Sequence, residues 1–211
     1  MSAATVGVAE HVNSAELVTI APDGRLLDRR RIELTGPDLP THPHHREGSW
    51  AMGRYLGTPG ARAIPLAEAV ALVERVRAAA VLGAGAAFAR LAGDLATRIG
   101  TIAIRACPAL PAGIEARIAD HRAQTFADSV MYREALAEAA ETRGWAVTWY
   151  DADTARADAA RALGVADLGP VLAAMGRAAG PPWQARHKLA AAAALAAGGT
   201  GTLRASRPQR R

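Results

Sequence analysis

The N-terminal stretch constrains the fold most, because it contains three short segments of β-type sequence joined by tight turns. Residues 5–10 are mostly small or β-branched, as in a buried strand, and residues 16–20 form a second such segment. A Pro-Asp-Gly sequence at 22–24 suits a tight turn, because proline fixes φ and glycine accepts a positive φ. The third segment, 25–34, carries three consecutive arginines, which indicate an edge strand. We therefore predict an antiparallel three-strand meander over residues 4–34.

The rest of the chain alternates helical patterns with two further strands, 101–106 and 145–150. Glycines and prolines separate the helical segments. Because of Gly83 and Gly85, the first helical segment is either one broken helix or two helices. The expected helices cover residues 66–80, 86–97, 112–143, 153–163, 167–179 and 183–197. Because helices connect the later strands, we predict that these strands run parallel to the first one.

The 112–143 segment is expected to contain a short helix and then a long one that begins at Asp120. Its apolar side chains at helical spacing define the face predicted to point inward: Phe126, Val130, Met131, Ala135 and Leu136. Asp120, Gln124 and Asp128 share another face, and Arg122 lies near the helix start. This second group fits the binding of a phosphate or carboxylate at a helix N-terminus. Pairing between solvated surface side chains explains the same residues without any ligand.

Composition bounds the class of protein. A chain of 211 residues with 50% hydrophobic content suits a single domain, placed at 1–197, with a long loop rich in proline and histidine at 35–64. The net charge of +5 suits nucleic acid or a phosphorylated small molecule, although much of it lies in a tail, 198–211, expected to be disordered. The single cysteine, the lack of a signal-like N-terminus and the lack of a membrane span predict a cytoplasmic protein with no membrane partner.

In the order of its elements, the chain resembles the ribonuclease H-like superfamily, in particular the Holliday-junction resolvase branch. Residues 7–11 (GVAEH) are similar to the first-strand motif of that superfamily, and residues 183–197 resemble its closing helix. The loop at 41–45 is similar to one in bacterial proteins. The resemblance covers residues 4–197 and implies an α/β fold, in which a five-stranded mixed sheet is flanked by helices. It also implies an association with nucleic acid.

The same resemblance implies a pair of Mg²⁺ ions, held by carboxylates at the end of the first strand, near the end of the fourth strand and on the closing helix. The corresponding positions in this chain are Ala9, Ile104 or Arg105, and His187 or Lys188. None of these residues is a carboxylate. The comparison therefore implies a chain that lacks the standard two-metal set.

The densest group of candidate metal ligands lies in the long loop: His42, His44, His45 and Glu47. Neutral imidazole binds Zn²⁺ and other transition ions, so a divalent metal is a candidate cofactor, with His44 as a catalytic residue and the other three as ligands. Adjacent histidines do not easily bind one ion, and the loop has no helical i, i+4 pair. These two points favour a loop held by hydrogen bonds.

Other candidates lie where strands end and where the last helix begins. Glu10 and Asp151 both follow strands predicted to be parallel, so they form the preferred catalytic pair. Asp151 equally suits the start of the next helix. The candidate residues for binding an anionic ligand in the same cleft are Arg105, Arg186, His187 and Lys188.

These features leave three functions open. The first is a nucleic-acid-associated or nucleotide-associated protein. The second is a metal-dependent phosphodiester hydrolase that uses Glu10, the histidine loop and Asp151. The third is a structural module, in which the alanine-rich final helix is the contact surface of a homo-oligomer.

Overall fold

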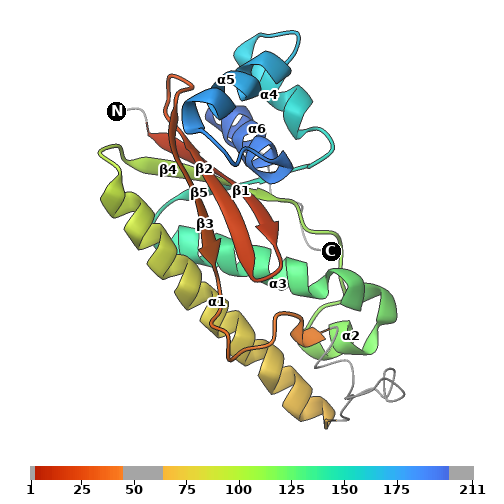
Figure 1. The fold of residues 1–211 in the computed structure, drawn as a ribbon. Coiled ribbons are helices and arrows are strands. Elements are labelled where there is room, and N and C mark those ends of the chain that lie inside the picture. Colours follow the sequence, from red (N-terminus) through yellow and green to blue (C-terminus); the bar gives the residue numbers. More distant parts are fainter. Residues whose placement is uncertain (1–2, 45–63, 200–211) are drawn as a thin grey trace.

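The computed structural model describes residues 3–44 and 64–199. Its centre is a five-stranded sheet in the order β3-β2-β1-β4-β5 (Figure 1). The strands are β1 (Ala4–His11), β2 (Ser14–Ile20), β3 (Leu26–Glu33), β4 (Ile99–Arg105) and β5 (Ala146–Tyr150). β1, β2 and β3 pair antiparallel, whereas β1 pairs parallel with β4, and β4 parallel with β5. The predicted meander and the parallel later strands are confirmed.

Helices cover both faces of the sheet (Figure 1). α1 and α3 lie on one face, and α6 packs on the other face with α4 and α5 beside it. The helices are α1 (Leu66–Asp94), α2 (Ile114–Ala119), α3 (His121–Thr142), α4 (Ala155–Leu163), α5 (Gly169–Ala179) and α6 (Ala185–Gly199). None of the described helices is long and apolar enough to span a membrane.

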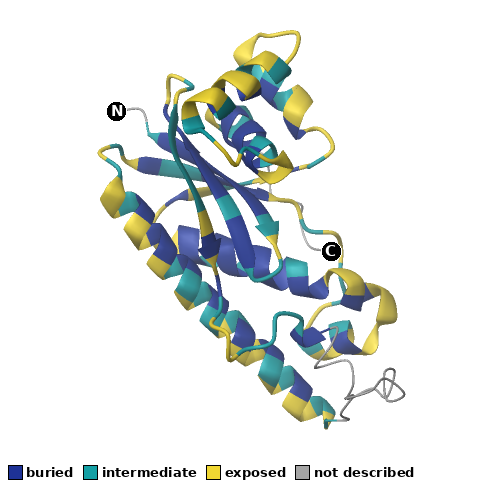
Figure 2. Cartoon of the chain, in the orientation of Figure 1, coloured by how far each residue is buried: buried dark blue, intermediate teal, exposed yellow. Residues whose placement is uncertain are grey.

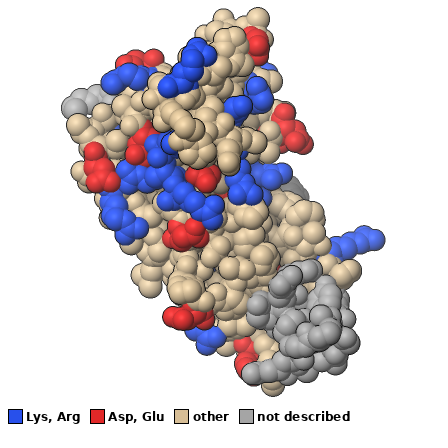
Figure 3. Space-filling view, viewed as in Figure 1, with Lys and Arg blue, Asp and Glu red and all other residues tan. Residues whose placement is uncertain are grey.

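The sheet order confirms that β3 is an edge strand. Its three arginines form polar contacts within β3, with α1 and with the loop before α6. Arg29 donates to the backbone carbonyls of Gly180 and Pro182, in the loop before α6. Arg30 forms ion pairs with Asp28 and with Asp94 of α1. Arg31 lies 2.8 Å from Glu33. Near the middle of the molecular face that Figure 3 shows, Lys and Arg side chains are interleaved with Asp and Glu side chains. The basic run therefore has an architectural role.

α1 is one continuous helix, which settles the question left by its two glycines. A Cβ on Gly83 would lie 2.1 Å from the carbonyl oxygen of Leu34, just beyond β3, whereas a Cβ on Gly85 would meet nothing within 4 Å. Gly83 therefore allows the helix to approach the backbone that leaves the edge strand. It does not interrupt the helix.

β1 is buried along most of its length (Figure 2), and its alternating side chains enter two separate cores. Val6 and Val8 pack against α1 and α3, whereas Ala9 packs against α6. A Cβ on Gly7 would lie 1.8 Å from the carbonyl oxygen of Ala190, so α6 lies directly on the β1 backbone. This close contact suits the alanine-rich sequence of α6.

The prediction that Phe126 points inward is wrong. Its side chain is 52% exposed, although Val130, Met131, Ala135 and Leu136 are buried as expected. α3 enters the core that it shares with α1 and the sheet from Met131 onward, because the first turns of α3, which include Phe126, extend beyond the edge of the sheet (Figure 1).

Candidate functional site

The two central parallel strands separate at their carboxyl ends. Pairing between β1 and β4 ends at Gly7 and Ala103, whereas β4 and β5 remain paired as far as Arg105 and Tyr150. The hydroxyl of Tyr150 reaches across and donates to the carbonyl oxygen of Val8 at 2.8 Å. Such a division at the carboxyl edge is where α/β sheets bind ligands.

Arg133 of α3 bridges this division. Its Nε donates to Oε2 of Glu10 at 2.7 Å, and its Nη1 donates to the carbonyl oxygen of Ala106 at 3.1 Å. The two side chains are only 9% and 3% exposed, so each compensates the other's buried charge. The other oxygen of Glu10 accepts the backbone N–H of Val12. The predicted catalytic carboxylate is therefore committed to an ion pair.

No sequence motif identifies Arg133, but its position on α3 is a signal. Arg133 lies between Met131 and Ala135 on the apolar stripe of α3, and a charged residue there needs a buried partner.

A cleft of about 430 Å³ opens beside this ion pair. It lies between the end of β1, the end of β4 and the first turns of α3. The described residues that line it include several of the predicted site residues and are Glu10, His11, Val12, His42, Arg105, Gln124, Thr125, Asp128, Ser129 and Arg133. Most of them are polar, and Arg105 and His11 are exposed. We refer to this cleft as the α3 cleft.

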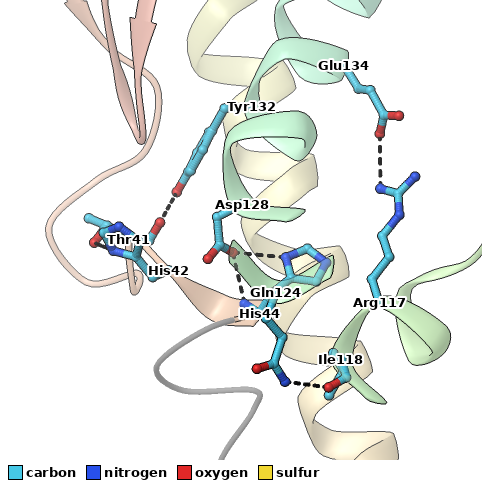
Figure 4. A network of polar contacts seen from close by, with 9 residues as sticks. All are labelled: Thr41, His42, His44, Arg117, Ile118, Gln124, Asp128, Tyr132 and Glu134. Atoms are coloured by element: carbon cyan, nitrogen blue, oxygen red, sulfur yellow. Dashed lines mark hydrogen bonds and ion pairs between the residues drawn. The ribbon is translucent and has the colours of Figure 1, made fainter. Parts of the chain in front are cut away.

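His44 and Asp128 form a buried pair next to the α3 cleft (Figure 4). Oδ1 of Asp128 accepts both the backbone N–H and the Nδ1–H of His44, each at 2.9 Å. Only 1% of His44 and 5% of Asp128 is exposed. Among the described residues, the buried Nε2 of His44 and Oδ2 of Asp128 have no hydrogen-bond partner. Because an unpartnered buried polar atom costs free energy, a pair with two of them is a candidate for function.

The segment before His44 is held to α3 by further polar contacts. The hydroxyl of Tyr132 donates to the carbonyl oxygen of Thr41 at 3.1 Å, and Thr41 Oγ1 lies 2.8 Å from Nδ1 of His42 (Figure 4). These contacts place His42 in the wall of the α3 cleft. The hydrogen-bonded interpretation of the histidine loop therefore describes its first part, residues 41–44.

The predicted metal ligands His45 and Glu47 lie outside the described residues, so the proposed ligand set stays a prediction. Among the described residues, no group of three or more His, Cys, Asp and Glu side chains is arranged to hold a metal ion.

The polar group at the start of α3 divides into two parts. Asp120 is the N-cap, and its Oδ1 accepts the backbone N–H groups of Arg122 and Ala123 at 2.8 and 3.3 Å. The side chain of Arg122 is exposed. Gln124 and Asp128 are buried, and Gln124 donates to the carbonyl oxygen of Ile118 (Figure 4). Solvated surface pairing is therefore wrong for Gln124 and Asp128.

The remaining candidates do not line the α3 cleft. Asp151 is exposed after β5 and accepts the backbone N–H of Asp153 in the turn before α4, so the structure does not bring it to the site of Glu10. The candidates on α6 lie on the opposite face of the sheet from α3, with Arg186 exposed and Lys188 partly buried.

His187 of α6 is held by two polar contacts. Its Nε2 lies 3.2 Å from Oε2 of Glu16, and its Nδ1 accepts the backbone N–H of Gln184 at 3.0 Å. The ring also stacks on Trp183. Glu16 pairs with Ala9 across β1 and β2, so the contact lies beside the end of β1 on the α6 face.

Two buried groups near the cleft favour their neutral forms. Burial raises the pKa of Tyr150 to about 12, and the nearby Arg105 only partly offsets this effect. Burial also raises the pKa of the half-buried Cys107 thiol, against the opposing charge of Arg133. Cys107 is therefore a weak nucleophile near neutral pH.

Among the comparisons with known proteins, one solved structure supports the fold. T. thermophilus RuvC in complex with a Holliday junction substrate superposes with a TM-score of 0.52, at 14% identity over 94% of each chain. The chain has a ribonuclease H-like fold. A second structure, of Thermus thermophilus RuvC, superposes with a TM-score of 0.47, at 16% identity over 93% of this chain and 94% of that one. No protein-family model and no curated protein matches the sequence.

The Mg²⁺ pair implied by a ribonuclease H-like fold does not fit the residues at the expected positions. Mg²⁺ requires hard oxygen ligands, but Ala9 and Ile104 are buried aliphatic side chains. Arg105 is a cation, and both ring nitrogens of His187 already have contacts. The residues at these positions therefore do not form the carboxylate set that a Mg²⁺ pair requires.

Proposed function

We propose that this protein binds nucleic acid at the carboxyl edge of its sheet and lacks the standard two-metal nuclease site. The observation that carries the proposal is a difference in pairing at this edge. Glu10 is paired with Arg133, and Glu16 lies close to His187. Arg105 and Arg122 are exposed and form no ion pair with a described residue. Two exposed arginines at this edge are therefore available to contact a phosphate backbone.

The fold supports this proposal, because a solved structure with the same fold is RuvC in complex with a Holliday junction substrate. The proposal assigns to this chain the broader property, binding to nucleic acid, and leaves open which form of nucleic acid it prefers.

Fluorescence anisotropy with a labelled four-way junction and a labelled linear duplex tests the proposal. The protein should first be truncated after residue 199, because the basic tail alone would bind a polyanion. We expect binding to survive this truncation, to weaken as salt is added, and to weaken further in Arg105→Gln. Arg177→Gln, an exposed arginine of α5, is the matched control and should bind like the unmodified protein. Loss of all binding on truncation would contradict the proposal.

Incubation of the same DNA with Mg²⁺ or Mn²⁺ tests the second part. We expect intact DNA, because the implied carboxylate positions hold no carboxylate. Metal-dependent cleavage that the Glu10→Gln variant lacks would instead establish a nuclease with a different carboxylate arrangement.

A metal-dependent hydrolase with a non-standard site is the second candidate function. It is favoured by Nε2 of His44, a buried ligand-type nitrogen with no hydrogen-bond partner in the described part of the chain. Elemental analysis after incubation with Mn²⁺ or Zn²⁺ distinguishes it from the first candidate. About one ion per chain, lost in His44→Ala, would favour the hydrolase. No retained ion would leave binding as the function.

A further inference from the structure

We propose that the α3 cleft accepts a single unpaired nucleotide, with its base stacked on Phe126. This inference rests on the proposed function and names the form of nucleic acid that the site recognises. Its starting point is the exposure of Phe126, since 52% of this residue is open to solvent on the second turn of α3. The other phenylalanine of the chain, Phe88, is fully buried.

Phe126 lies beside the cleft and not at a random surface position. Residues three and four apart on a helix are surface neighbours. Phe126 is therefore adjacent to Ser129, which lines the α3 cleft, and to Arg122, which is exposed. An aromatic ring, an arginine and a polar cleft thus adjoin on the first turns of one helix. Aromatic platforms next to cationic side chains are how proteins hold unpaired bases.

The lining of the α3 cleft suits the polar edge of a base. Thr125 and Ser129 offer hydroxyl groups that both donate and accept. The volume of about 430 Å³ falls within the range of small-molecule sites.

Base pairing and stacking exclude a paired base from this site. In a duplex, both faces of a base are stacked and its edge is paired, so neither can meet Phe126 or the cleft lining. An unpaired base exposes both. Arg105, at the exposed end of the lining, and Arg122, one turn before Phe126, are placed to neutralise the flanking phosphates.

The test compares two ligands of the same sequence, a blunt duplex and a duplex with one bulged 2-aminopurine. Affinities are measured by anisotropy at one fixed salt concentration, on the protein truncated after residue 199. We expect the protein to bind the bulged duplex more tightly than the blunt one. The fluorescence of 2-aminopurine should change on binding, because the base then stacks on Phe126. Phe126→Ala should weaken binding to the bulge by roughly 5- to 100-fold and leave the affinity for the blunt duplex unchanged.

Two further variants keep the test decisive. Leu82→Ala removes a side chain that is 75% exposed on α1 and should change neither affinity. Phe126→Leu retains an apolar side chain without an aromatic face, and should lose bulge binding as Phe126→Ala does. Circular dichroism establishes that each variant is folded.

The outcomes separate this inference from the proposed function. Equal affinity for bulged and blunt duplexes, or full bulge affinity in both Phe126 variants, would overturn the single-nucleotide site and leave nucleic-acid binding standing. Failure to bind either ligand would overturn both.

Discussion

The two helical layers meet the same sheet with different chemistry. α6 lies on β1 through Gly7 and a buried run of small residues, Ala190–Ala194. α3 places Gln124, Asp128 and Arg133 in buried positions over the carboxyl ends of β1 and β4. Packing of small apolar groups needs only shape complementarity, whereas each buried polar group needs a partner.

This difference shows where function is best sought. The resemblance to ribonuclease H-like proteins implies carboxylates that approach the end of β1 together with the closing helix. In this chain, the α6 face has Ala9 and a Glu16–His187 contact there. The α3 face instead has a cleft, a bridging arginine and a His–Asp pair in which two atoms have no partner within residues 3–44 and 64–199. We therefore propose that the functional residues lie in the α3 layer and that the α6 layer supports the sheet.

The largest effect is expected from breaking the bridge on the α3 side. Arg133→Met leaves Glu10 buried without its partner, which should lower the free energy of unfolding by about 3–5 kcal/mol. Adding Glu10→Gln removes the uncompensated charge and should recover part of the loss. Urea denaturation measures both variants. A loss below about 1 kcal/mol in Arg133→Met, as for exposed pairs, would show that the bridge is not buried in solution.

A comparable effect is expected on the α6 side from a single methyl group. Gly7→Ala places a Cβ against the backbone of Ala190, so α6 must move away, at a cost of about 3 kcal/mol. Gly85→Ala is the matched control, because the added methyl group meets nothing and should stabilise α1 by up to about 1 kcal/mol. Thermal unfolding of both variants checks the prediction, and equal melting temperatures would contradict the close contact.

The His44–Asp128 pair should respond asymmetrically. Asp128→Leu removes the acceptor of two donors, the N–H and the Nδ1–H of His44, and should cost about 2 kcal/mol. His44→Leu keeps one of these hydrogen bonds and should cost about 1 kcal/mol. Urea denaturation of the two variants measures the difference. If His44→Leu proved the more destabilising, packing of the imidazole and not the hydrogen bonds would hold this segment.

The smallest effect concerns the Tyr150 hydroxyl between the separated strands. Tyr150→Phe loses the hydrogen bond to Val8 and should cost about 1 kcal/mol at neutral pH. Because burial raises the pKa of Tyr150 to about 12, its neutral form stabilises the fold fully below its ordinary value. This contribution is lost as the pH rises through the raised value. Between pH 10 and 12, the free energy of unfolding should therefore fall less in Tyr150→Phe than in the unmodified protein.

The fold could be predicted because its signals are local. The Pro-Asp-Gly turn and the arginines of β3 specify the meander and its edge, and glycines mark the ends of several helices. Gly83 misled the prediction of α1, since its role is contact with Leu34, a residue far away in the sequence. Helical periodicity likewise placed Phe126 on the inner face, but cannot show where a helix extends past the sheet.

The site was only partly predictable, because its contacts join distant segments. Glu10, Arg105 and Asp128 were identified as candidates and line one cleft. The partners that define their chemistry come from elsewhere: Arg133 lies 123 residues from Glu10, and His44 lies 84 residues from Asp128. Asp151 has the right position at a strand end, but its local turn toward α4 directs it away.

The salt dependence of binding tests most directly whether the α3 side of the carboxyl edge holds the functional surface. Binding of a duplex to the protein truncated after residue 199 should be compared with binding to the same protein carrying Arg105→Gln and Arg122→Gln. Each phosphate contact contributes about 0.9 to the slope of log affinity against log salt, so we predict that the double variant lowers the slope by about 2. An unchanged slope would show that nucleic acid, if bound, contacts another surface, and would contradict the assignment of function to the α3 layer.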